Sequence, residues 1–131
     1  MKATIVIEKG TDGMYSCYMR DEMEHFGLSG YGTSVEEAKS DLLAAYEEIK
    51  ALEQEEGRDV PELQFVYKYD IQSFFNYFSF LNVSKVAERA GINPSLMRQY
   101  TSGTANAGQR QYEKLRAAVR GFAKEFSLAT F

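Results

Sequence analysis

In the second half of the chain, residues 81–103 read LNVSKVAERAGINPSLMRQYTSG. Gly91 interrupts a helical pattern there, and glycine adopts the left-handed backbone of a sharp helix end without a Cβ clash. Asn93 and Pro94 follow it, and these residue types favour the cap and the first turn of a new helix. The stretch therefore predicts two short helices joined by a tight turn, with the second helix beginning at Pro94.

Small and apolar residues occupy the positions of this helix pair that should face inward. Ala87 stands where the two helices cross, and its small side chain allows them to approach closely. Ile92 follows the turn and is expected to fill the core. The other inward positions hold Val86, Ala90, Met97 and Tyr100. The pattern is that of a helix-turn-helix in which Ala87, Gly91 and Ile92 have structural roles.

Polar residues occupy the outward positions of the second helix. Ser95, Arg98 and Gln99 are spaced to share one exposed face, from which Arg and Gln side chains can bond base edges in the major groove of DNA. Basic residues elsewhere in this half are expected to contact phosphates, and the candidates are Lys85, Arg110 and Lys114. The alternative is an amphipathic helical hairpin with no role in DNA binding.

Charge separates these alternatives, because a DNA-binding surface must be basic. Residues 1–70 hold seven Lys and Arg against sixteen Asp and Glu, whereas residues 71–131 hold eight against three. The net charges are −9 and +5, a division that the overall −4 conceals. We therefore expect an acidic partner-binding domain at 1–70 and a helix-turn-helix DNA-binding domain at 71–131.

The first seventy residues show the alternation of a sheet. Ala3, Ile5 and Ile7 alternate with mostly polar residues, which predicts a strand with one buried face. A turn at 10–13, a return strand at 14–20 and a short glycine-rich third strand or loop at 27–32 are expected to follow.

A helix and a last strand complete the first domain. Thr33 or Ser34 is expected to cap the helix, whose apolar face would comprise Val35, Ala38, Leu42, Ala45, Tyr46, Ile49 and Leu52. The strand would comprise residues 63–69 and lie parallel to an earlier one, with the helix on one face of the sheet. The fold class is thus α+β, a small β-β-β-α-β sheet domain followed by an all-α domain. Apolar residues recurring from Ile71 to Leu81 predict the first helix of that second domain.

A further helix should end the chain. Its apolar stripe comprises Tyr112, Leu115, Val119, Phe122 and Phe126. The stripe can close the domain's own core or pair with a second subunit, and we expect both uses, in a homodimer or a higher homo-oligomer.

Two stretches resemble the HicB antitoxin family, in its long form with a C-terminal helix-turn-helix of the Cro/repressor type. Residues 30–38, GYGTSVEEA, are similar to that family's Gly-x-Gly-x-Thr-x-Glu-Glu-Ala entry into the helix, and residues 86–93, VAERAGIN, match the helix-turn-helix. The resemblance implies a partial RNase H-like fold, which binds a HicA-like toxin that cleaves messenger RNA, and a tail that represses the toxin–antitoxin operon by binding operator DNA.

One stretch departs from the family pattern. Residues 20–27, RDEMEHFG, stand where the family often has an Asp-Phe-Pro-Gly-like segment. A helix-turn-helix transcriptional regulator without a toxin partner is therefore the alternative function.

Residues that could support catalysis are few. A metal-dependent nuclease needs converging carboxylates, and the available acids are Asp12, Asp21, Glu22, Glu24 and Asp41. Asp12 suits a turn, and residues 21–24 suit an acidic loop. His25 is the only histidine, and Cys17 is expected to be a buried apolar residue of a strand. We expect no enzyme, no metal and no cofactor.

Localisation is expected to be cytoplasmic. A single cysteine excludes an internal disulfide framework, which favours a reducing compartment. No apolar run approaches the length of a membrane span or of a signal peptide.

Overall fold

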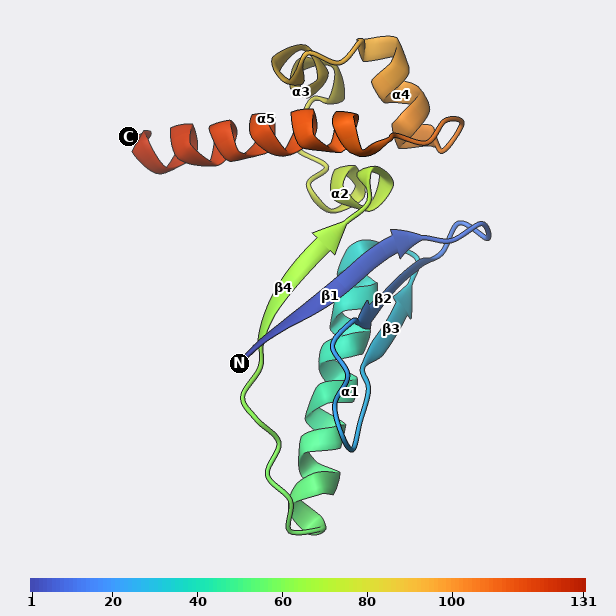
Figure 1. The fold of residues 1–131 in the computed structure, drawn as a ribbon, viewed down its shortest axis with the longest axis vertical. Coiled ribbons are helices and arrows are strands. Elements are labelled where there is room, and N and C mark those ends of the chain that lie inside the picture. Colours follow the sequence, from blue (N-terminus) through green and yellow to red (C-terminus); the bar gives the residue numbers. More distant parts are fainter. The chain divides into compact units, whose positions relative to one another are not determined.

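The chain forms two units, Met1–Tyr77 and Phe78–Phe131, and the computed structural model describes all 131 residues. The first unit contains β1 (Lys2–Lys9), β2 (Tyr15–Met19), β3 (Ser29–Gly32), α1 (Val35–Glu55), β4 (Gln64–Tyr69) and α2 (Ile71–Tyr77). The second contains α3 (Val83–Ala90), α4 (Pro94–Ser102) and α5 (Gln109–Leu128) (Figure 1). The predicted α+β class is confirmed.

The four strands form one mixed sheet in the order β3-β2-β1-β4. β1 pairs antiparallel with β2, and β2 pairs antiparallel with β3. β4 lies parallel to β1, with Tyr67 beside Ile5, as the crossover through a helix predicts. The expected turn between β1 and β2 is present, since Gly13 has a φ of 82° and the Asp12 carboxylate accepts a hydrogen bond from the Met14 amide (2.9 Å).

The core of the first unit lies between α1 and one face of the sheet (Figure 1). Ala3, Ile5 and Ile7 are fully buried, which confirms the alternation read from β1. Helix α1 approaches β3 so closely that a Cβ on Gly30 would lie 2.3 Å from the Ala38 carbonyl oxygen. Glycine is therefore required at this strand position.

Helix α1 begins with a pair of hydrogen bonds that resembles a capping box. Ser34 is the N-cap, and its hydroxyl accepts a hydrogen bond from the Glu37 amide (3.1 Å), while the Glu37 carboxylate accepts one from the Thr33 amide (3.1 Å). Val35, Ala38, Leu42 and Tyr46 are buried as expected. Leu52, which the periodicity also placed on the inward face, is 59% exposed. The buried face of α1 therefore ends before Leu52.

Helix α2 lies in the first unit, whereas the sequence led us to place it in the second. The unit boundary falls after Tyr77, and α2 buries Ile71 and Ser73 against the sheet unit. The Ser73 hydroxyl donates to the Ile7 carbonyl oxygen (3.1 Å), which fixes the start of α2 beside β1. The apolar stripe of 71–81 is thus not one helix of the second domain.

The second unit packs α3 against both α4 and α5. Its buried residues are Val86, Ala87, Ile92, Met97, Tyr100, Leu115 and Ala118. On α5 the predicted stripe is only partly used, because Leu115 is buried while Phe126 is 60% exposed. None of the helices is both long enough and apolar enough to span a membrane.

Candidate nucleic-acid interface and acidic surface

The turn between α3 and α4 has the geometry that the sequence predicted. Gly91 has φ 72° and ψ 31°, the left-handed region that other residues enter only with strain. The amide of Ile92 donates to the Ala87 carbonyl oxygen (2.9 Å) and the amide of Gly91 to that of Glu88 (3.2 Å). These bonds satisfy carbonyls at the end of α3 and fix the direction in which α4 departs.

Asparagine caps the start of both helices. The Asn82 side chain accepts a hydrogen bond from the Lys85 amide (3.1 Å) at the start of α3. The Asn93 side chain accepts from the amides of Ser95 (2.9 Å) and Leu96 (3.3 Å), with Pro94 at the first helical position of α4. The predicted start of the second helix is confirmed.

The structure places the three predicted base-reading residues on one exposed face of α4. Ser95, Arg98 and Gln99 are all exposed, while Met97 and Tyr100 face the core. The side-chain amide of Gln99 makes no hydrogen bond within the protein, so its nitrogen and its oxygen are both available to a base edge. This is the arrangement that a recognition helix requires.

Arg98 has one neighbour that the sequence analysis did not identify. Its guanidinium lies 3.5 Å from the hydroxyl of Ser84, in the first turn of α3. The contact is long and exposed, so it restrains the guanidinium only weakly and leaves it accessible. Fourteen residues separate the two in sequence, and no spacing rule would have paired them.

The three predicted phosphate contacts come from α3 and α5. Lys85 is exposed and lies 3.6 Å from Glu88, an exposed pair of small energetic weight. Arg110 is exposed in the first turn of α5. Lys114 is half-buried, and its ammonium donates to the Gly91 carbonyl oxygen (3.4 Å), which ties it to the turn. Of the three, Lys85 and Arg110 are the more available to a phosphate.

A fourth basic residue of this unit, Arg89, is engaged within the protein. Its guanidinium lies 4.8 Å from the centroid of the Phe122 ring and pairs with the Glu125 carboxylate. Both partners lie on α5, more than thirty residues away in sequence. Arg89 therefore links α3 to α5, and its charge is already partly compensated.

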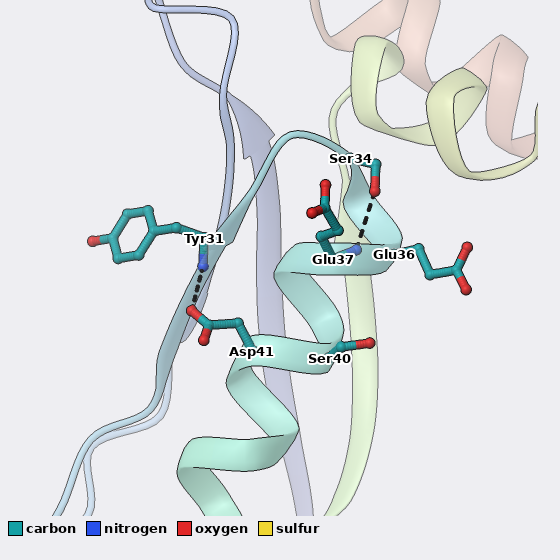
Figure 2. Close-up of a pocket in the computed structure, with 6 residues that line it drawn as sticks. All are labelled: Tyr31, Ser34, Glu36, Glu37, Ser40 and Asp41. Atoms are coloured by element: carbon teal, nitrogen blue, oxygen red, sulfur yellow. Dashed lines mark hydrogen bonds between the residues drawn. The ribbon is translucent and has the colours of Figure 1, made fainter.

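The surface of the first unit is acidic around the start of α1. An open hollow there is lined by Tyr31, Ser34, Glu36, Glu37, Ser40 and Asp41 (Figure 2). Asp41 lies opposite Tyr31 in that view, and its carboxylate accepts a hydrogen bond from the Tyr31 amide (2.9 Å). Three carboxylates and no cation line this hollow, so its chemistry suits a basic partner.

Three of the five acids considered for metal catalysis accept hydrogen bonds from the backbone. Asp12 caps the β1–β2 turn, Asp41 bonds the Tyr31 amide, and Asp21 accepts from the Thr4 amide of β1 (2.6 Å). Asp21 is thus a half-buried structural acceptor and not a freely solvated loop residue. No three of the acidic, histidine or cysteine side chains converge as metal ligands would.

Cys17 and His25 occupy ordinary structural positions. The Cys17 thiol is buried and donates to the Ala38 carbonyl oxygen (3.1 Å), and burial raises the pKa of this thiol to about 11. At neutral pH it is protonated and a poor nucleophile. His25 is exposed, 3.9 Å from Glu24.

Comparisons of the chain with protein-family models, with curated proteins and with solved structures found no significant match.

Proposed function

We propose that this chain is the antitoxin of a type II toxin–antitoxin pair and the repressor of its own operon. In this proposal the second unit binds operator DNA through α4, and the first unit binds and occludes a basic, HicA-like toxin that cleaves messenger RNA. The chain itself has no catalytic step in this scheme, and it acts as a homodimer or a higher homo-oligomer on DNA.

The observation that supports DNA binding most strongly is the exposed polar face of α4 on a capped, left-handed turn. Ser95, Arg98 and Gln99 share that face, in a unit whose basic residues exceed its acidic ones by five. A polyanion is attracted by the net charge, and a base edge is selected by side chains that present several donors and acceptors in fixed directions.

The proposal for the first unit depends on its opposite charge. Residues 1–77 carry net −9, which repels DNA and attracts a basic protein. The exposed carboxylates near the start of α1, with Glu36 and Asp41 among them, offer acceptors to Lys and Arg side chains. The resemblance of residues 30–38 to the HicB family supports the particular partner.

A regulator that binds DNA without a toxin is the second candidate. Residues 20–27, which differ from the family's usual segment, favour it. The two functions differ in one measurable property, the presence of a basic protein bound to the first unit.

The test is affinity purification of the tagged full-length chain from its native cells, followed by identification of bound proteins. The proposal predicts one small basic protein in stoichiometric amount. A charge-reversed variant, Glu36→Lys, should weaken the binding of this partner and keep the affinity for DNA, because the Glu36 carboxylate lines the hollow, is exposed and makes no hydrogen bond or ion pair within the protein. Recovery of no basic protein, with DNA binding intact, would favour the second candidate.

A further inference from the structure

Strand β4 forms one edge of the sheet, with β1 on one side of it and no strand on the other (Figure 1). The Gln64 amide donates to the Met1 carbonyl oxygen (2.9 Å), beside the start of β1. Because successive backbone groups of a strand point in opposite directions, the even-numbered residues of β4 bond β1. The N–H and C=O groups of Phe65 and Tyr67 therefore point to the open edge.

The two edges of the sheet differ in how they are protected. The outward backbone groups of Phe65 and Tyr67 on β4 have no hydrogen-bond partner in the protein. At the other edge, β3 has only four residues, and its outward amide at Tyr31 donates to the Asp41 carboxylate (2.9 Å). Sheet edges are commonly shortened or covered because unpaired strand groups bind other chains. With six residues and no such acceptor, β4 is the edge that remains open to another strand.

The side chains of β4 are also incompletely covered. Phe65 and Tyr67 lie on the side of the sheet that packs against the core, but both are only half-buried, and their ring centroids are 6.5 Å apart. Val66 lies on the opposite face of the sheet and is 44% exposed. A strand added beside β4 would cover apolar surface on both faces, in addition to pairing the open backbone groups.

We propose that β4 pairs antiparallel with β4 of a second copy of this chain, so that the two four-stranded sheets form one continuous sheet. With the two-fold axis at Val66, Phe65 of each copy lies opposite Tyr67 of the other, and each such pair exchanges both N–H···O bonds. Gln64 of each copy then lies opposite Lys68 of the other. This register joins aromatic with aromatic side chains and places no like charges opposite each other.

The distribution of charge favours a second copy over a basic protein at this edge. Within β4 there is one cation, Lys68, and no carboxylate, although the unit as a whole carries net −9. A basic protein is therefore attracted to the carboxylates near the start of α1 and not to this strand. A second β4 has the same length, the same open backbone groups and aromatic side chains at the matching positions. The pairing does not depend on what either unit binds.

A cysteine at Val66 tests the pairing directly. Residues opposite each other in a non-hydrogen-bonded antiparallel pair have Cα atoms about 4.5 Å apart, within the disulfide range of about 4.4–6.8 Å. Full-length Val66→Cys should therefore form a disulfide-linked dimer under mild oxidation, seen on a non-reducing gel. Wild type gives the background, because its only cysteine, Cys17, is buried. Tyr18→Cys is the matched control and should not cross-link, since Tyr18 is 42% exposed on the same face but lies on the inner strand β2.

A charge at the same two positions tests the interface without a cross-link. Val66→Lys places two ammonium groups opposite each other, and we expect it to raise the dissociation constant about ten-fold in sedimentation of the full-length chain. Tyr18→Lys adds the same charge to the same face and should leave association unchanged. Any association through the second unit is common to both variants, so the difference between them reports the edge of β4.

Two results would overturn the proposal. One is the absence of a disulfide-linked dimer of Val66→Cys above the wild-type background. The other is an equal loss of association in Val66→Lys and Tyr18→Lys, which would assign the contact to the face of the sheet instead of the edge of β4.

Discussion

The amide of Ile92 donates a 2.9 Å hydrogen bond to the carbonyl oxygen of Ala87, across the left-handed turn at Gly91. A Cβ added to Gly91 would meet no atom within 4 Å, so the cost of a side chain there comes from the positive φ and not from a neighbouring atom at the Cβ. We expect Gly91→Val to lower the free energy of unfolding by roughly 1–2 kcal/mol, measured by thermal melts.

Gly121 is the matched control for that substitution. It lies inside α5, its φ is not positive, and a Cβ there also meets nothing within 4 Å. Gly121→Ala should therefore raise the free energy of unfolding by about 0.5–1 kcal/mol, because alanine favours the helix. If Gly91→Val and Gly121→Ala shift the melting midpoint in the same direction, the assignment of strain to Gly91 is wrong.

Gly30 should not tolerate a larger residue either, and the reason there is a steric clash and not backbone strain. A Cβ there would lie 2.3 Å from the Ala38 carbonyl oxygen and 2.5 Å from the Leu42 amide nitrogen, both backbone atoms of α1. Gly30→Ala must displace the helix from β3, at a cost of about 1–3 kcal/mol or more in denaturant unfolding. Gly27→Ala, where no atom lies within 4 Å, should cost far less, and equal losses would contradict the close packing of α1 on β3.

The buried thiol of Cys17 predicts a dependence of stability on pH. Burial raises its pKa from 9.0 to about 11, so between these values the unfolded chain has released the proton while the folded chain still holds it. The free energy of unfolding should therefore fall as the pH rises through this range. Urea unfolding at several pH values, compared between wild type and Cys17→Ala, isolates the thiol. A difference between the two proteins that stays constant from pH 8 to 11 would contradict this prediction.

The local patterns of the sequence were sufficient for most of the fold. Alternation in β1, the cap at Ser34 and the glycine turn at Gly91 each depend on residues close in the chain, and each was confirmed. What local patterns could not predict is the placement of α2. Its apolar stripe is compatible with either unit, and the bond that fixes its start joins Ser73 to Ile7, which are distant in sequence.

In the candidate DNA-binding site, too, local patterns predicted some features, whereas others depend on contacts between residues distant in sequence. The outward positions of Ser95, Arg98 and Gln99 follow from helical periodicity once the start of α4 is known. The engagement of Lys114 with the Gly91 carbonyl oxygen does not, because it requires α5 to pack beside the turn. The contacts of Lys39 with Tyr67, Tyr69 and Tyr77 likewise bring together three elements that only the tertiary fold places side by side.

DNA recognition by α4 is the central claim, and one set of titrations tests it most directly. The full-length chain, Gln99→Ala and Arg110→Ala are titrated, at several salt concentrations, onto a duplex from upstream of the chain's own gene and onto a scrambled duplex. We predict that Gln99→Ala loses about 1–3 kcal/mol on the upstream duplex and little on the scrambled one. Arg110→Ala should weaken binding to both and flatten the salt dependence. Equal loss on both duplexes for Gln99→Ala, or no preference of the wild-type chain for the upstream duplex, would contradict the account.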